Sequence, residues 1–276
     1  MIDANRYFGY YDHGAHSPAI GDGTYDSRFP TDINGNPRPT DNPDIGCYES
    51  TRTSPAGSTI IYVSPAGSDS TGSGEFDNPY KSLYKGIRAS HYNYNDVIML
   101  DQGEYYEENT IQLRGRNVTI QSSHGPDSTK VIFNTPKAFT NQELDWCGGS
   151  YPCYGYTNTL SGIEVDIIPS TEEGIYMYDN PIHLSNVIIS DEIISLRTGF
   201  DINGLKSYTN EGFNSAFIRL YHDNIPENYT FNFNNLDIDA NSDDIIWIHN
   251  DTCGSYCTYD MNIYVTNSTL RAGNGS

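Results

Sequence analysis

The sequence is short of basic residues and has no long apolar run. Its 15 Lys and Arg stand against 36 Asp and Glu, which gives a formal net charge of −21. A surface of this charge repels nucleic-acid phosphates, so nucleic acid is excluded as a partner. No apolar run approaches the roughly 20 residues that cross a bilayer, so no membrane span is expected. The acidic excess fits solubility alone or the binding of Ca²⁺, which prefers oxygen ligands, and both interpretations stay open.

A signal peptide is also missing, because Met1–Asn5 contains no basic region followed by an apolar core. The sequence stops at Ser276, soon after a predicted strand. We therefore expect an excerpt, or a processed form, of a longer secreted polypeptide.

Only five cysteines are present, and four of them form two closely spaced pairs. Cys147 and Cys153 flank one turn-like stretch, and Cys253 and Cys257 flank another. We predict two small disulfide loops, which require an oxidising compartment. A zinc site is the alternative, but both spacings exceed that of C-x₂-C and no histidine pair accompanies them. Cys47 is left over, to be free, buried or bonded to another chain.

Five N-x-S/T sequons occur, although a chain rich in Asn, Ser and Thr produces several by chance. Together with the cysteine pairs they indicate a secretory route, glycosylation and an extracellular or cell-surface location. The candidate acceptors are Asn117, Asn228, Asn250, Asn267 and Asn274.

Hydrophobic residues make up only 36% of the chain, which is low for an ordinary globular core. After Thr59 they gather in short runs such as Val97–Leu100, separated by turn-forming residues. One helix is predicted, over Tyr80–Ala89, with Asn78 as its N-cap and Pro79 at its first position. Short strands dominate elsewhere, so the chain is predicted to be all-β.

An asparagine precedes an alternating strand at four places, namely Asn117, Asn186, Asn235 and Asn267. Stacked coils explain this pattern, because asparagines at equivalent corners can hydrogen-bond one another along the stack. A β-sandwich with long loops is the alternative fold.

Residues 59–135 carry a series of short motifs in the order Ile61–Ser64, Asp77–Leu83, Asp96–Leu100 and Asn117–Ser122. The series resembles the start of pectate-lyase-like proteins, the right-handed parallel β-helix superfamily. This resemblance implies a right-handed parallel β-helix over residues 59–276. It also implies that the short helix near 79–89 caps the first coil and shields its open end from edge pairing.

Residues 17–49 resemble a different part of such proteins, the segment that closes a β-helix at its C-terminal end. The matching motifs are Ser17–Gly21, Asp32–Pro39 and Pro43–Glu49. The resemblance implies a turn-rich closing segment over residues 1–52 and a linker at 53–58, before the next β-helix begins. We therefore predict a tandem arrangement, in which residues 1–50 of a neighbouring chain or repeat complete the open last coil head to tail.

No catalytic residue is predicted from the sequence. Proteins with the resembled fold cleave acidic polysaccharides, and the lyases among them need Lys or Arg near Ca²⁺-binding carboxylates. The sequence shows no carboxylate cluster that recurs beside a basic residue at coil spacing. The densest acidic group is a weak candidate Ca²⁺ site whose outward carboxylates also fit simple solvation, and it consists of Asp237, Asp239, Asp243 and Asp244.

These features together predict an extracellular structural or adhesive β-helix glycoprotein. Its copies would repeat head to tail in a surface filament or appendage, with no cofactor and with glycans as further partners. The alternative is a polysaccharide lyase or a glycan-binding module. A lyase would release unsaturated sugars from uronate polymers in a Ca²⁺-dependent way, whereas a structural subunit would form elongated particles without turnover.

Overall fold

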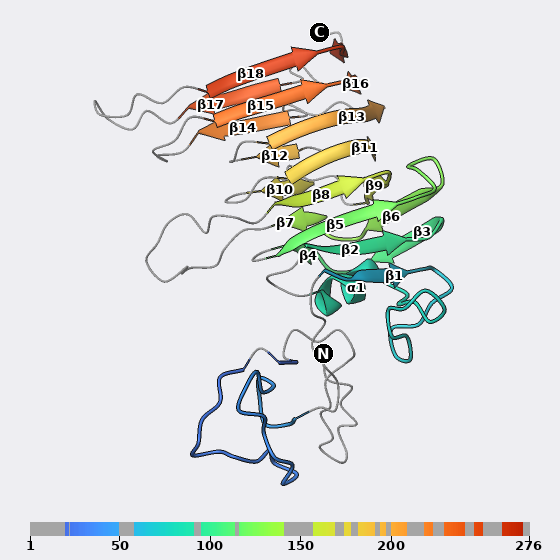
Figure 1. Cartoon of the computed structure of the whole chain (residues 1–276). Helices are drawn as coiled ribbons and strands as arrows, with labels where there is room; N and C mark the ends of the chain where they lie inside the picture. Colours follow the sequence, from blue (N-terminus) through green and yellow to red (C-terminus); the bar gives the residue numbers. More distant parts are fainter. Residues whose placement is uncertain are drawn as a thin grey trace, which may run out of the picture.

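The computed structural model describes residues 20–21, 23–49, 58–90, 95–113, 116–140, 157–168, 174–177, 182–190, 194–196, 200–208, 218–222, 229–240, 246–250 and 261–272. Most of them form one tall stack of strands (Figure 1). Residues 20–21 and 23–49, called the N-terminal segment below, lie beyond the first strand of the stack. The last strands lie at the opposite end of the stack (Figure 1).

The larger sheet has two rows of strands. The first row, in hydrogen-bonding order, is β1 (Ile60–Val63), β2 (Asn95–Leu100), β5 (Asn117–Ser122), β8 (Asn158–Ser161), β11 (Ile182–Ser190), β13 (Phe200–Tyr208), β15 (Tyr229–Asn234) and β18 (Met261–Thr266). The second row is β3 (Gly103–Glu107), β6 (Thr129–Phe133), β9 (Glu164–Ile167), β16 (Asp237–Ala240) and β19 (Thr269–Ala272). The long strands β11 and β13 belong to both rows, because β11 also pairs with β9 and β13 with β16.

The smaller sheet closes the coils on another side. Its strands are β4 (Ile111–Gln112), β7 (Phe139–Thr140), β10 (Ile175–Met177), β12 (Ile194–Leu196), β14 (Ile218–His222) and β17 (Ile246–Asn250). Every pairing between these named strands, in both sheets, is parallel. The described chain is therefore all-β and solenoid-like, as predicted, and the antiparallel β-sandwich is excluded.

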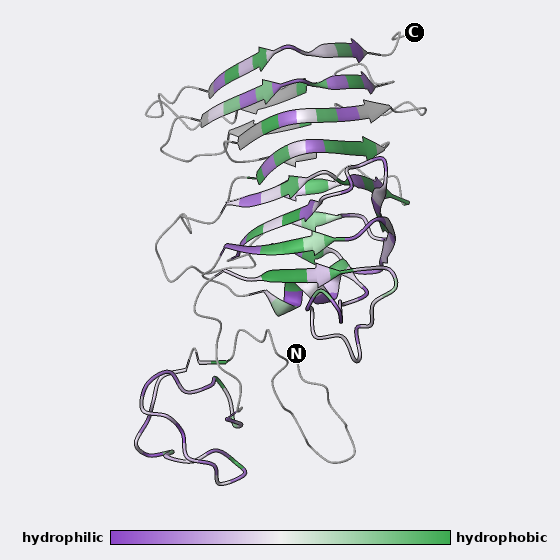
Figure 2. Cartoon of the chain, turned by 45° about the vertical axis from the view of Figure 1, so that its right-hand side comes forward, coloured by the Kyte–Doolittle hydropathy of each residue, from purple (hydrophilic) through white to green (hydrophobic). Residues whose placement is uncertain are grey.

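The core consists of columns of inward-facing side chains that run along the stack. The first row has an alternating pattern of buried and exposed residues, seen in Figure 2 as changes of hydropathy along each strand. The register aligns one column through Ile61, Ile98, Ile120, Leu160, Leu184, Ile202, Phe233 and Val265. The first seven members are at most 1% exposed. Burying such side chains is the main favourable term in the folding of the stack.

A left-handed backbone conformation marks the corner between the two rows. Asn186, Asn235 and Asn267 have φ values of 52°, 55° and 51°, and glycines take the same role in other coils. Asparagine and glycine adopt this conformation more readily than other residues, which explains the asparagine pattern of the sequence. The pattern is confirmed at these three positions. Asn117 is different, because it begins β5 and its Oδ1 accepts a hydrogen bond from the Thr157 N–H at 2.6 Å.

The corner asparagines bond from one coil to the next. Asn235 Nδ2 donates to Asn203 Oδ1 at 2.9 Å, and Asn267 Nδ2 donates to Asn234 Oδ1 at 3.0 Å. These bonds connect successive coils and hold the corners in register. A side-chain ladder is thus present in the last coils, but each corner asparagine bonds to the residue before the neighbouring corner and not to the predicted corner asparagine.

The predicted helix is present but begins later than expected. α1 spans Leu83–Ala89, and its N-cap is Ser82, whose Oγ accepts a hydrogen bond from the Lys85 N–H at 3.1 Å. The predicted cap at Asn78 is wrong, since the Asn78 N–H instead donates to the Glu75 carbonyl in a turn. Among the described residues no helix is long and apolar enough to cross a membrane.

Candidate functional site

The first coil of the stack is closed by the chain itself. Leu83 and Ile87 of α1 are buried, and a Cβ on Gly86 would lie only 2.7 Å from Val63 Cγ2, so the helix packs tightly on β1. The outer edge of β1 is also paired, because the Tyr62 N–H donates to the Gly74 carbonyl at 2.8 Å and the Tyr80 N–H donates to the Tyr62 carbonyl at 3.0 Å. Among the described residues, the core of the first coil is therefore covered, and the outer edge of β1 is paired at Tyr62.

A buried carboxylate anchors this closing helix. Glu107, at the end of β3, accepts hydrogen bonds from the backbone N–H groups of Leu83 at 2.6 Å and Tyr84 at 3.2 Å. Burial raises the pKa of Glu107 to about 7, against the opposing effect of these two donors. The Glu107 carboxylate thus connects α1 to the second coil, and the free energy lost in removing the carboxylate from water opposes this contact.

The last coil is built differently, because its inward side chains are uncovered. Val265 is 43% exposed although it stands directly over Phe233, which is fully buried. Leu270 is 38% exposed over the fully buried Ile238. In the described residues β18 pairs only with β15, and β19 only with β16. This end, called the open coil below, therefore presents core positions together with unpaired strand edges.

The N-terminal segment is held by a polar framework. The Asp32 carboxylate accepts hydrogen bonds from the backbone N–H groups of Asn34, Asn36 and Glu49, at 2.8, 2.8 and 3.0 Å. Desolvation alone would raise the pKa of Asp32, but these donors and the Asn36 side chain lower it to about 2. Asp32 is therefore ionised at any physiological pH, and it fixes the turn around it.

A second part of this framework centres on Arg38. Its Nη1 lies 3.1 Å from Glu49 Oε2 in an ion pair whose side chains are only 11% and 10% exposed. The same guanidinium donates to the carbonyl oxygens of Asp44 and Gly46, and Glu49 Oε1 accepts from the Asp44 N–H at 3.0 Å. These contacts join residues 5 to 11 positions apart, so polar bonds hold the loops of the segment together although it has little regular secondary structure.

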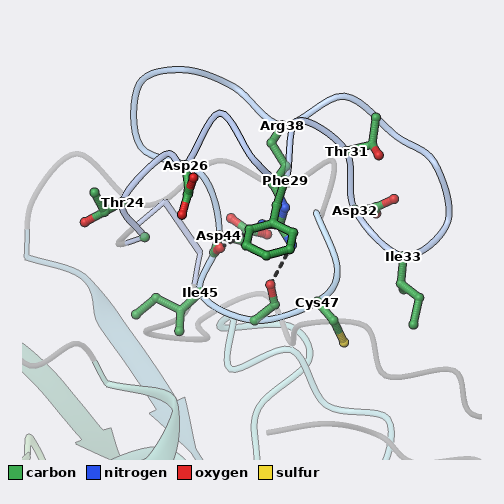
Figure 3. A pocket seen from close by; sticks show the side chains of 12 residues that line it. Thr24, Asp26, Phe29, Thr31, Asp32, Ile33, Arg38, Asp44, Ile45 and Cys47 are labelled. Carbon is green, nitrogen blue, oxygen red and sulfur yellow. Dashed lines mark hydrogen bonds between the residues drawn. The ribbon is translucent and has the colours of Figure 1, made fainter.

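This scaffold surrounds a hollow of about 740 Å³, called the apolar hollow below (Figure 3). Three of its lining side chains are large, hydrophobic and exposed: Phe29 at 63%, Ile33 at 67% and Ile45 at 53%. Cys47 also lines it, and it is the exposed free thiol of the described residues. An open hydrophobic surface on a rigid polar frame is typical of a site that binds another molecule.

The outer face of the second row carries clusters of opposite charge that the sequence analysis missed. Lys130 Nζ lies 2.9 Å from Glu164 Oε1 and 2.8 Å from Asp166 Oδ2. Arg271 Nη1 lies 3.1 Å from Asp237 Oδ1 and 3.9 Å from Asp239 Oδ2. The expectation that no acidic pair lies beside a basic residue at coil spacing is therefore wrong. The available signal was the repeat of an acidic residue, any residue and Asp at the start of β9 and β16.

Lys130 is held in its charged form by this arrangement. Partial burial lowers the pKa of Lys130, but the hydrogen bonds to Asp166 and Glu164 outweigh it and raise the pKa above its usual value. A lyase base must accept a proton, which is harder for an amine stabilised as a cation. The cluster is therefore better suited to joining coils than to abstracting protons.

The predicted Ca²⁺ ligands are not brought together with further carboxylates in the described part of the chain. Asp237 and Asp239 face Arg271, and no group of three or more His, Cys, Asp or Glu there could hold a metal ion. Asp243 and Asp244 lie outside the described residues, so the site stays a prediction.

The predicted modification sites are only partly described. Asn117 is half-buried and begins β5, Asn250 ends β17, and Asn267 is exposed at its corner. The other predicted positions lie outside the described residues: Asn228, Asn274, Cys147, Cys153, Cys253 and Cys257. Of the two sequons whose side chains are described, Asn267 is the more exposed, but its Nδ2 already donates to Asn234 and it lies on the open coil.

No protein-family model matches the chain, and no curated protein or solved structure matches it either. The pectate-lyase-like resemblance of residues 59–135 and 17–49 therefore stays a prediction from motifs. Evidence about function therefore comes from the exposed hydrophobic side chains of the open coil and of the N-terminal segment.

Proposed function

We propose that this chain is an extracellular structural or adhesive protein, a right-handed parallel β-helix that assembles end to end through its open coil. The observation that carries the proposal is the exposure of Val265 and Leu270 at positions that are fully buried one coil earlier. Water contact at these positions is unfavourable, and association that covers them recovers the burial energy.

The described geometry supports a β-helix of the usual hand. Parallel neighbours require crossover connections, and crossovers between parallel strands are right-handed in nearly all proteins. Successive coils are also joined by the asparagine corners and the Lys130 and Arg271 ion pairs. A stack braced in this way is stiff, as a filament subunit or a stalk requires.

The surface chemistry fits an extracellular setting. A net charge of −21 keeps the sides of such particles apart, so that growth is directed to the ends. Glycans at the sequons and disulfides at the two cysteine pairs would add bulk and loop constraints, and both belong to this proposal.

The test is the size of the purified chain as its concentration rises, measured by sedimentation velocity and negative-stain microscopy. Elongated particles that lengthen with concentration are expected. Val265→Asp should abolish them, because it places a charge on the apolar end. The matched control is Asn262→Asp, which adds the same charge to an outward position of the same strand and should assemble normally. A wild-type chain that stays monomeric at every concentration would overturn the proposal.

The alternative of a polysaccharide lyase or a glycan-binding module has one observation in its favour. Tyr106 is 64% exposed on the outer face of β3, and its hydroxyl donates to Glu104 Oε2 at 2.6 Å. An exposed aromatic ring beside a carboxylate can stack on a sugar. Release of unsaturated sugars from a uronate polymer in the presence of Ca²⁺ would establish the lyase, and sugar-dependent quenching of tyrosine fluorescence would indicate the binding module.

A further inference from the structure

We infer that the surface that covers the open coil is the apolar hollow of the N-terminal segment of a second copy. This inference rests on the proposed end-to-end assembly and names its partner surface. Phe29, Ile33 and Ile45 would pack on the inward side chains of β18 and β19.

The two surfaces match in their hydrophobic exposure. The hollow exposes Phe29 at 63% and Ile45 at 53%, and the open coil exposes Val265 at 43% and Leu270 at 38%. Within one copy the two surfaces lie at opposite ends of the molecule, so they cannot cover each other (Figure 1). Each is therefore left to a partner molecule.

The two surfaces also differ in their density of negative charge. Residues 20–49 hold six Asp and Glu and two Arg, a net charge of −4, whereas Arg271 is the only charged residue of 261–272. In a chain with a net charge of −21, most pairs of surfaces repel each other. At the open coil, Arg271 lies 3.1 Å from Asp237 and 3.9 Å from Asp239 and offsets part of their negative charge, so the N-terminal segment meets less repulsion there than at a strongly acidic surface.

The polar framework of the segment makes it a good docking surface. Arg38, Glu49 and Asp32 already hold its loops in place through hydrogen bonds and a largely buried ion pair. Little conformational freedom is left to lose on binding, so more of the apolar contact contributes to affinity.

The placement of the two surfaces determines the type of assembly. Each copy offers one hollow beyond its first coil and one open coil at the other end (Figure 1). A contact between two different surfaces leaves one of each unsatisfied on every dimer. The assembly therefore continues as a chain of copies with a single polarity.

A cross-linking experiment tests this contact directly, because Cys47 lines the hollow and is exposed. Thr269→Cys places a second thiol on exposed β19, beside Leu270. A short bis-maleimide linker should then join copies into a ladder of covalent multimers. The ladder should disappear in the Thr269→Cys, Cys47→Ser double variant. Ser123→Cys, exposed on the side of the stack, should give no ladder and serves as the control.

A second measurement separates this inference from the proposed function. Ile33→Asp and Ile45→Asp should each raise the concentration required for assembly at least tenfold. Thr40→Asp, exposed in the same segment but outside the hollow, should change it less than twofold. If the two hollow variants assemble like the wild type while Val265→Asp does not, the hollow is not the partner and end-to-end assembly stands. If the wild type never assembles and no ladder forms, both ideas are wrong.

Discussion

The two ends of the stack differ in whether their core side chains and outer strand edges are covered. At the first coil, α1 covers the core, and the loop around Gly74 and Tyr80 pairs with the edge of β1. At the last coil, the same inward column ends in Val265, which is 43% exposed, whereas Ile61 at the other end is fully buried. The comparison shows that covering the end of a stack requires residues outside the repeating strands. Among the described residues such a cover is present at the first coil and not at the last.

The largest expected difference between the ends is in the cost of truncating a leucine. Leu83→Ala at the closed end removes a fully buried side chain and should lower the free energy of unfolding by about 2–5 kcal/mol. Leu270→Ala at the open coil removes a side chain that is already 38% exposed and should cost about 1 kcal/mol or less. Urea unfolding of the dilute chain measures both. Equal costs would mean that the two ends are equally packed.

The corner asparagines give a second comparison between an inner and an outer coil. Asn235→Ala loses the bond to Asn203 and leaves alanine at a φ of 55°, for a cost of about 1–2 kcal/mol. Asn267→Ala makes the same change one coil later but should cost less than half as much in dilute solution, because the open coil is the less stable part. Glycine at either position should restore the backbone part of the loss. A larger effect at Asn267 would contradict an unstable last coil.

The closed end should also respond to pH through Glu107. Its pKa rises from an ordinary value of 4.5 to about 7 on folding, so the folded chain binds a proton more tightly than the unfolded chain. The contribution of Glu107 to stability should therefore be fully present below pH 4.5 and be lost as the pH rises from there through 7, by at most about 1.4 kcal/mol per pH unit. Thermal unfolding across this range measures the slope. Glu107→Gln should flatten it, and an unchanged slope in that variant would assign the effect to another group.

The smallest expected effect is that of the exposed ion pair on the open coil. Arg271→Gln removes a contact with Asp237 whose two side chains are 51% and 38% exposed, and it should change the free energy of unfolding by about 0–1 kcal/mol. Its effect on assembly at low salt should be larger, since Arg271 is the only charged residue of 261–272. Sedimentation velocity of the wild type and of Arg271→Gln, each at low and at high salt, measures the effect on assembly. If assembly is insensitive both to salt and to Arg271→Gln, charge does not contribute to the contact between copies.

Local patterns allowed much of the stack to be predicted from the sequence. The short apolar run Val97–Leu100 predicted a strand, and β2 confirms it with an alternation of buried residues. The corner positions of Asn186, Asn235 and Asn267 were also foreseeable, because few residues other than glycine adopt that backbone conformation readily.

What could not be predicted depends on contacts between distant parts of the chain. The helix starts at Leu83 because Tyr80 is held in pairing with β1, and Ser82 then caps the first turn. Ser82 was a local signal, but the pairing of Tyr80 and the bonds from Glu107 on β3 depend on distant parts of the chain. Coil length also varies, from 18 residues between the partners Leu184 and Ile202 (202 − 184) to 40 between Thr119 and Thr159 (159 − 119). Because coil length is not constant, the pairing of Lys130 with Glu164 and Asp166 could not be predicted from their spacing in the sequence.

The most direct test of the account is amide hydrogen exchange in the two ends of the stack at low and high protein concentration. In dilute solution the amides of β18 should exchange rapidly, while those of β2 stay protected. At high concentration β18 and residues 23–47 should both become protected, and β2 should not change. Protection of β18 that is independent of concentration, whether complete or absent, would contradict the claim that the open coil is covered by another copy.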